Sequence, residues 1–269
     1  MEEESRGYKE FQVLVSSLNA DPVELASKMN ITGDAVIVNQ CDEEGLGSFP
    51  TEWGEVQYVL SKERGVGLSR NLALVNATAD FVLFADDDIR YYPNYEAKVL
   101  HEFDKIPFAD VLIFNIDVCE ERRTYYNYDY ERVTWKKSGR YPTYAIAARM
   151  ESLDAAGIEF SPYFGGGAKY GCGEDSLFLM DCLRADMNIF CVPVTLGREE
   201  ERPSTWFRGY NEKYFEDKGV LYRCLYGRLA GAVALRFILK HRKTQCNEVP
   251  AGRAYKLMKK GIRKAKKGL

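Results

Sequence analysis

Three consecutive carboxylates, Asp86, Asp87 and Asp88, are the residues whose types and spacing most directly suggest chemistry. They follow the apolar run Asp80–Ala85, which is typical of a buried strand. In an extended segment, residues i and i+2 point the same way, so Asp86 and Asp88 converge while Asp87 points elsewhere. Carboxylate oxygens suit Mg²⁺ or Mn²⁺, which commonly bridge to a diphosphate. The alternative is a solvated acidic turn that caps the following helix.

A second carboxylate pair, Glu174 and Asp175, opens a predicted helix over Glu174–Asp186 and follows the glycine-rich segment Phe164–Gly167. A positioned carboxylate can take the proton of a hydroxyl nucleophile while a new bond forms. Acidic residues in the first turn of a helix also interact favourably with the helix macrodipole. The pair by itself therefore fits either a catalytic base or a structural helix start.

An alternation of strands and helices must position both carboxylate groups. Several of the predicted strands are apolar on both faces, which indicates a mostly parallel sheet covered by helices on both sides. Ligand sites in such α/β sheets lie outside the carboxyl ends of the strands. The predicted strands are Phe11–Ser17, Ala35–Asn39, Val56–Leu60, Asp80–Ala85 and Ala109–Asn115, and the predicted helices between them are Asp21–Met29, Leu68–Ala77 and Tyr95–Phe103.

Two further segments are expected beside this core. Tyr125–Lys137 is rich in tyrosine and has little periodicity, which indicates an irregular or antiparallel insertion. Its tyrosines either stack on sugar rings or form one face of an exposed strand. Met150–Gly157 is predicted to be a short helix.

Composition narrows the class of protein. The 269 residues are 46% hydrophobic and contain no apolar run long enough to span a bilayer. The seven cysteines include no CxxC pair, which argues against a disulfide framework or a zinc ribbon, and only two histidines are present. Met1–Arg6 is acidic and does not resemble a signal peptide. We expect a cytoplasmic protein, with a peripheral position on the inner face of the cell membrane as the alternative.

The C-terminal region is strongly basic. From Arg236 onward the chain has twelve Lys/Arg and one acidic residue, a charge of +11 against −14 for the remainder. We predict one long helix over Tyr222–Lys243 and a basic stretch over Tyr255–Lys267 with an apolar stripe of Leu257, Met258 and Ile262. This tail is either a solvated amphipathic helix or a contact for an anionic membrane surface. Nucleic acid is not expected as a partner, because no recognised motif accompanies the charge and the rest of the chain is acidic.

Five short motifs occur in order along the chain: Asn19-Ala-Asp21 after the first strand, Asn39-Gln-Cys-Asp42 after the second, Arg64-Gly-Val-Gly-Leu-Ser-Arg-Asn71, Phe84-Ala-Asp-Asp-Asp88, and Gly173-Glu-Asp-Ser-Leu-Phe178. Together they give the chain a resemblance to family 2 glycosyltransferases of the GT-A (Rossmann-like) fold, from about Phe11 to about Gly219. In that resemblance, Phe84–Asp88 is the metal-binding DxD strand end and Gly173–Phe178 contains the Glu-Asp motif. We therefore expect a GT-A domain over 8–218 and a helical basic extension over 219–269.

The resemblance implies an inverting transfer of a sugar from a nucleoside diphosphate donor, with uridine as the expected base. The acceptor would be a hydroxyl group of a glycan or lipid-linked glycan in polysaccharide assembly. Asp175 would act as the base, with Glu174 as the second choice, and Asp86 and Asp88 would hold Mn²⁺ or Mg²⁺. The expected nucleotide contacts are Asn19, Asn39, Gln40, Asp42, Arg64, Leu68, Arg70, Asp86 and Asp87.

One departure from the family pattern concerns the metal. Many GT-A enzymes supply a further ligand, often a histidine, downstream of the Glu-Asp motif, but Gly197–Trp206 contains none. Arginine cannot ligate a cation but can bind a diphosphate. The expected diphosphate and lid residues are Arg198, Arg202, Ser204, Thr205 and Lys218.

Two other functions remain open from the residues. A nucleotidyltransferase would share a related sheet and paired aspartates, but it usually has a Gly-rich loop after the first strand, where this chain reads Leu18-Asn-Ala-Asp-Pro22. A catalytically silent module that binds sugar nucleotides or membranes would keep the fold without turnover.

Overall fold

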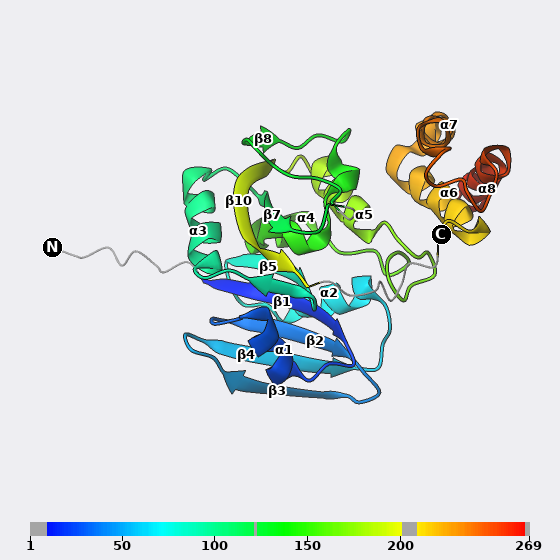
Figure 1. Cartoon of the computed structure of the whole chain (residues 1–269). Coiled ribbons are helices and arrows are strands. Elements are labelled where there is room, and N and C mark those ends of the chain that lie inside the picture. The colour runs from blue at the N-terminus through cyan, green and yellow to red at the C-terminus, as the bar shows by residue number, and fades with distance from the viewer. Residues whose placement is uncertain (1–9, 121–122, 201–208, 267–269) are drawn as a thin grey trace.

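The computed structural model describes residues 10–120, 123–200 and 209–266, and its centre is a mixed ten-stranded sheet (Figure 1). The strands lie in the order β3-β4-β2-β1-β5-β9-β7-β10-β6, with β8 paired to β10. The strands that run parallel to one another are β1 (Phe11–Leu18), β2 (Ala35–Gln40), β4 (Glu55–Ser61), β5 (Phe81–Asp86), β7 (Val111–Asp117) and β10 (Ile189–Glu199). The antiparallel strands are β3 (Gly45–Pro50), β6 (Ile89–Tyr91), β8 (Glu131–Arg132) and β9 (Ile146–Arg149).

Helices cover both faces of this sheet, and its central strands are therefore buried on both sides. Every residue of β2 is buried, as are the first seven of β1. On one face, α1 (Pro22–Met29) and α3 (Tyr95–Lys105) enclose the first hydrophobic core. On the other, α2 (Val66–Asn76), α4 (Met150–Ala156) and α5 (Glu174–Arg184) enclose the second. The predicted α/β class with a sheet flanked by helices is confirmed.

The order of the strands creates a switch point beside β1. The chain passes from β1 to β2 and β4 on one side, and α2 then carries it to β5 on the other side of β1. Ser16 of β1 lies opposite Asp86 at the end of β5. In open α/β sheets, ligands bind in the crevice outside the carboxyl ends of the strands at such a point. The Asp86–Asp88 turn therefore lies where the fold favours a ligand.

The C-terminal region forms a compact unit of three helices, α6 (Glu212–Tyr226), α7 (Ala230–His241) and α8 (Ala251–Ala265) (Figure 1). The prediction of one helix over Tyr222–Lys243 is wrong. Gly227 has φ +53°, a positive value that glycine adopts without steric cost and that ends α6, and a 3₁₀ turn over Gly227–Leu229 leads into α7. The expected division between 8–218 and 219–269 stays a prediction, and α6 crosses that boundary.

The apolar stripe of the basic tail faces inward. Leu257, Met258 and Ile262 of α8 are 8%, 0% and 9% exposed and pack in the core of the three-helix unit. They are therefore not available to enter a lipid surface, and a membrane contact through α8 would depend on its lysines alone. Among the described helices, none has the length and apolar character needed to cross a bilayer. All seven cysteines lie in described ranges and are free thiols.

Candidate active site at the carboxyl edge of the sheet

Arg70 joins the two carboxylate groups that the sequence places 88 residues apart, from Asp86 to Glu174. Its Nη2 lies 2.6 Å from Oδ1 of Asp86, and its Nη1 lies 3.1 Å from Oε1 of Glu174. The Arg70 side chain is only 4% exposed, so these charge-assisted hydrogen bonds are shielded from solvent. The end of β5 and the start of α5 therefore form one site.

Aromatic packing holds the Arg70 guanidinium in place. The group lies 5.4 Å from the centre of the Phe160 ring, which stacks on Phe178 of α5 at 4.2 Å. Asn71, the next residue of α2, donates to the Phe160 carbonyl and accepts from the Phe160 amide. Burial alone would lower the pKa of Arg70, but Asp86 and Glu174 together raise it above its ordinary value. The buried cation therefore stays charged.

Asp175 is the carboxylate best suited to act as a base. Its Oδ1 accepts hydrogen bonds from the Ser176 amide at 2.6 Å and the Ser176 hydroxyl at 3.2 Å. Burial and the neighbouring charge of Glu174 raise the pKa of Asp175 to about 7, although Ser176 and Arg70 act in the opposite direction. A base is most effective when its pKa lies near the working pH, so Asp175 has the properties of a proton acceptor at neutral pH.

The glycine-rich loop leaves room for this arrangement. Gly165 has φ +103°, and a Cβ at this position would lie 2.9 Å from the carboxyl carbon of Glu174. A side chain there would push Glu174 away from Arg70. The loop also fixes the start of α2, since the Val66 amide donates to the Gly166 carbonyl at 2.9 Å.

A hollow of about 230 Å³ opens beside Asp175. Three residues that sequence reasoning missed, Arg140, Tyr144 and Glu199, contribute to its wall. They come from short or irregular segments and from a strand end, and no motif or periodicity marks them. The full lining is Thr124, Gly139, Arg140, Pro142, Tyr144, Asp175 and Glu199. Acidic and basic groups thus both face the space next to the proposed base.

The three consecutive aspartates have different surroundings. Asp86 faces Arg70, and its side chain is 33% exposed. Asp87 accepts from the Leu18 amide at 3.4 Å, which ties the turn to the end of β1. The Asp88 carbonyl accepts from the Glu200 amide at 2.7 Å. The turn is therefore held by β1, α2 and the end of β10.

No group of three or more His, Cys, Asp or Glu side chains in the described ranges is arranged to hold a metal ion. The donor set that remains is the pair of carboxylates Asp86 and Asp88. Mg²⁺ is typically held by one or two carboxylates, with substrate phosphates and water completing the shell. Two carboxylates match the number of protein ligands in that mode, and a bound diphosphate would supply ligands that the protein lacks. The predicted metal role of both residues stays a prediction.

Two of the predicted nucleotide contacts are used inside the protein. Asn39 is 3% exposed and exchanges hydrogen bonds with the Ala20 backbone at 2.7 and 3.0 Å. Gln40 is 4% exposed and accepts from the Gly65 amide at 2.7 Å. Both amides therefore shape the loops at this edge, and their positions do not favour direct contact with a ligand.

Other predicted nucleotide contacts lie at the surface of the same edge. Asn19 is exposed, with a left-handed φ of +50°, and Leu68 is partly exposed on the first turn of α2. Arg64 lies 2.7 Å from Asp42 and also donates to the Cys41 carbonyl at 2.7 Å. This pairing holds the loop after β2 against the start of α2. Asn19, Asp42 and Leu68 are thus accessible beside the switch point.

The predicted diphosphate and lid residues are not assembled by the described contacts. Arg198 pairs with Glu200 at 3.1 Å. Lys218 of α6 has its ammonium 4.8 Å from the ring centre of Phe237 and 5.0 Å from that of Tyr214, which places it toward α7. Arg202, Ser204 and Thr205 lie outside the described residues.

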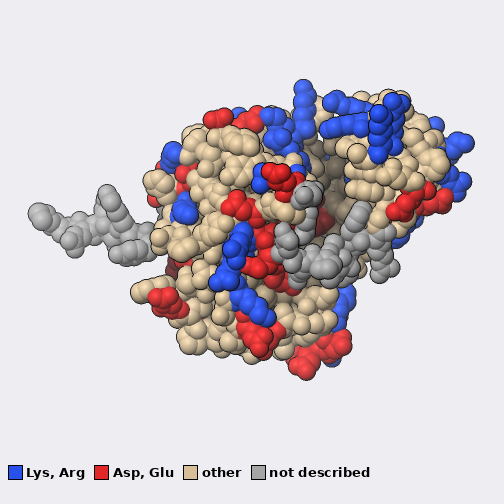
Figure 2. Space-filling model, viewed as in Figure 1, with Lys and Arg blue, Asp and Glu red and all other residues tan. Residues whose placement is uncertain are grey.

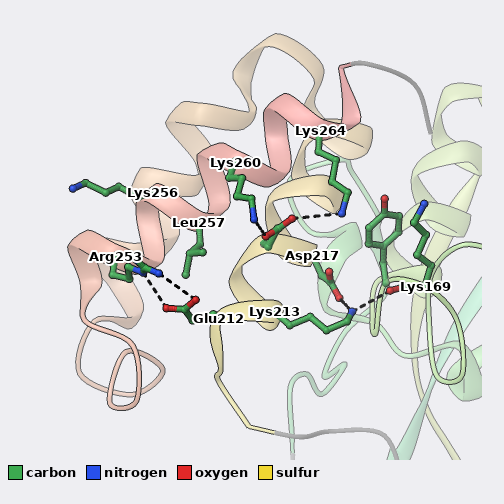
Figure 3. Close-up of a pocket in the computed structure, with 11 residues that line it drawn as sticks. Lys169, Glu212, Lys213, Asp217, Arg253, Lys256, Leu257, Lys260 and Lys264 are labelled. Carbon is green, nitrogen blue, oxygen red and sulfur yellow. Dashed lines mark hydrogen bonds and ion pairs between the residues drawn. The ribbon is translucent and has the colours of Figure 1, made fainter.

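A larger hollow of about 640 Å³ lies between α6, α8 and the loop residues Lys169 and Tyr170 (Figure 3). Most of its cations already have acidic partners: Lys213 pairs with Asp217, and Lys260 lies 2.7 Å from Glu216. Lys213 also donates to the Lys169 carbonyl at 3.0 Å, which ties α6 to the loop before the Glu-Asp motif. The hollow contains none of the predicted site residues. Its ion pairs lie within α6 or join α6 to α8, and the hydrogen bond from Lys213 to Lys169 connects the helical unit to the loop.

Comparisons with known proteins agree with this geometry. Residues 34–163 match the family model described as "Glycosyl transferase family 2", a segment that includes Arg64, Arg70 and the Asp86–Asp88 turn. The predicted resemblance to family 2 glycosyltransferases is confirmed over this segment. The prediction that the protein is a glycosyltransferase is thereby confirmed. No curated protein matches the chain.

Solved glycosyltransferase structures share the fold. The crystal structure of S. aureus TarS 1–349 in complex with UDP-GlcNAc has a TM-score of 0.60 and 16% identity, covering 88% of this chain and 74% of that one. Mannosyltransferase PcManGT from Pyrobaculum calidifontis, in complex with GDP-Man and Mn²⁺, has a TM-score of 0.53 and 13% identity, covering 98% and 77%. At these identities the likeness concerns the fold, which is that of GT-A enzymes.

Proposed function

We propose that this glycosyltransferase moves a sugar from a uridine diphosphate donor to a hydroxyl acceptor with inversion at the anomeric carbon. The observation that carries the proposal is the buried Arg70, which joins Asp86 at the switch point to Glu174 beside Asp175. This contact brings a carboxylate turn suited to a diphosphate next to a carboxylate suited to act as a base. The sugar nucleotides bound by the structural neighbours, UDP-GlcNAc and GDP-Man, support a sugar nucleotide as the donor.

In the proposed reaction, Asp175 takes the proton of the acceptor hydroxyl. The hydroxyl oxygen forms a bond to the anomeric carbon while the bond from that carbon to the diphosphate oxygen breaks. The electron pair of the broken bond leaves with the nucleoside diphosphate. A single base on the face opposite the leaving group gives one displacement and hence inversion. The raised pKa of Asp175 matches this role.

Asp86 and Asp88 would hold Mn²⁺ or Mg²⁺, which would neutralise charge on the diphosphate leaving group. Asp86 shares its charge with Arg70, so Asp88 is the carboxylate whose loss should weaken metal binding without disturbing the buried ion pair. The acceptor we propose is a glycan or lipid-linked glycan in polysaccharide assembly, entering from the hollow beside Asp175.

The proposal is tested by hydrolysis and transfer assays with a panel of sugar nucleotides, using the wild type, Asp175→Asn and Asp88→Asn. Both variants should lose transfer while remaining folded by circular dichroism. Arg132→Gln, at an exposed position on β8, is the matched control and should keep full turnover. Full turnover in both aspartate variants would overturn the assignment.

A silent binding module would give a different result. UDP would bind in calorimetry with Mn²⁺ present, yet no UDP-sugar would be hydrolysed or transferred by the wild type. Turnover of any one sugar nucleotide by the wild type rules out that alternative.

A further inference from the structure

The outward face of α7 carries leucines that the protein core does not use. Leu229, at the cap of the helix, and Leu239 near its end are each 62% exposed, and Leu235 between them is 43% exposed. Residues three and four apart lie on the same side of a helix, so these leucines form one row with the exposed Ala232. The opposite side, with Ala234 and Ile238, is buried against α6 and α8.

Cations flank the same row. Arg228, Arg236, Lys240, Arg242 and Lys243 are all exposed, and in the ranges that the structure describes none of them forms an ion pair. From Lys218 to Asn247 the chain has seven Lys/Arg and no acidic residue. Figure 2 shows Lys and Arg side chains gathered over the place that α7 occupies in Figure 1. We call this surface, from Arg228 to Lys243, the α7 face.

The other basic helix is different. On α8, Arg253 lies 2.9 Å from Glu212, and Lys260 and Lys264 share Glu216. Those cations fasten α8 to α6, and the apolar residues of α8 are buried between the two helices. Half of the six cations of α8 are thus used inside the unit, and the exposed Lys256, Lys259 and Arg263 lie on a helix whose apolar residues are buried. The α7 face instead directs its charge outward together with exposed leucines.

We propose that the α7 face docks this protein on an anionic lipid surface. A helix that presents leucines mixed with Lys and Arg can lie in the plane of a membrane interface, with its apolar side chains among the acyl chains and its cations at the headgroups. Each Lys or Arg near an anionic leaflet adds to the attraction. Because Leu229, Leu235 and Leu239 run the length of the helix, they fit an extended apolar layer.

A second copy of the chain is a poor occupant of this face. Two α7 faces would bring like charges together with no acidic residue between Lys218 and Asn247 to compensate. The α7 face is joined to the site through α6, whose Leu221 and Leu225 pack in one core with Leu177 and Met180 of α5. Docking through α7 would therefore hold the Glu174–Asp175 end of the site near the lipid surface.

The test is cosedimentation of the full chain with vesicles of phosphatidylcholine alone or of phosphatidylcholine with phosphatidylglycerol. The wild type should bind the anionic vesicles and not the neutral ones. The double variant Leu235→Ser with Leu239→Ser should bind them about tenfold or more weakly, since it removes apolar insertion. Arg236→Glu with Lys240→Glu should lower binding at least about tenfold through lost headgroup attraction.

Two controls locate the contact. Leu46→Ser removes a leucine that is 77% exposed on β3, and it should leave binding unchanged. Lys256→Glu with Lys259→Glu makes the same change of charge on α8 as the α7 reversal, and it should retain most of the binding. Equal losses in the α7 and α8 charge variants would overturn the assignment to α7.

Two other outcomes also overturn the proposal. If the wild type binds neither kind of vesicle, an acidic protein partner fits the face better than a lipid surface. If sedimentation velocity shows a dimer that the leucine variant abolishes, the face is an interface between copies. None of these measurements needs turnover, so failure here is distinct from failure of the proposed reaction.

Discussion

Replacing Arg70 by methionine removes the charge of the guanidinium and keeps an unbranched side chain of similar length. In the wild type, that charge lies 2.6 Å from Asp86 and 3.1 Å from Glu174, and the Arg70 side chain is only 4% exposed. The variant leaves two carboxylates facing an apolar side chain, with Asp175 close by. We expect Arg70→Met to lower the free energy of unfolding strongly.

The expected size follows from burial. Two opposite charges 4 Å apart interact by about 4 kcal/mol at an effective dielectric constant of about 20. Arg70 has two such partners, but their attraction is offset by the cost of removing the ions from water. Breaking a buried pair by removing one partner typically costs about 3–5 kcal/mol, because the remaining charge is left uncompensated. We therefore expect a loss of about 4 kcal/mol for Arg70→Met.

Urea unfolding followed by circular dichroism measures this loss. Arg132→Met is the matched control, because Arg132 is exposed on β8 and its only described side-chain contact is a hydrogen bond to Asn188 at 3.0 Å. The control should change stability by no more than about 1 kcal/mol. Adding Glu174→Gln to Arg70→Met should recover part of the loss, since it removes one orphaned charge. A loss below about 1 kcal/mol for Arg70→Met would refute the buried ion-pair network.

Three further predictions concern ionisation and ligands. The kcat/KM of the wild type should fall about tenfold for each pH unit below about 7, because Asp175 must be ionised, and a flat profile would contradict its role as base. Asp175→Asn should raise the free energy of unfolding at about pH 8 by at most about 4 kcal/mol in urea titrations. The variant should be the more stable protein because the raised pKa of Asp175 in the folded state makes its ionisation unfavourable there. The gain in unfolding free energy should therefore shrink as the pH falls below about 7, and it should vanish near pH 4. UDP at about 100 times its dissociation constant should raise the melting temperature by about 5–10 °C, and Asp88→Asn should remove the part that depends on Mn²⁺.

Much of the fold was predictable because its central elements are strongly patterned. The apolar runs that became β1, β2, β4, β5 and β7 are long enough to show strand character on their own. The strand β3, Gly45–Pro50, was missed because its composition is typical of a loop and most of it is exposed. It is a strand only because β4 supplies hydrogen-bond partners along its length. The break at Gly227 was missed because apolar residues continue on both sides of it.

The site was predictable as two groups of residues but not as one assembly. Motif order identified Asp86–Asp88 and Glu174–Asp175, yet nothing local relates them across the chain. Their proximity depends on α2 and α5 packing on the same face of the sheet, which is a property of topology. Arg70 was expected to contact a nucleotide, and its burial between two carboxylates became visible only in three dimensions. Asn39 and Gln40 were also expected to contact a nucleotide, because they stand at the end of a predicted strand. The structure instead shows their side-chain amides hydrogen-bonded to the backbone of Ala20 and Gly65.

The charges around Asp175 act in opposite directions, and their balance sets its pKa. Its place in the first turn of α5 favours the ionised form, as do the Ser176 hydrogen bonds and the charge of Arg70. Burial and Glu174 favour the protonated form and prevail. Glu174→Gln should therefore lower the pKa of Asp175, whereas Arg70→Lys, which weakens the paired contact, should raise it. The acid limb of the pH–rate profile would then move in opposite directions in the two variants. If the Arg70–Glu174 pair were only structural, the acid limb would stay at the same pH in both variants, because the base would then lie outside the electrostatic field of these two charges.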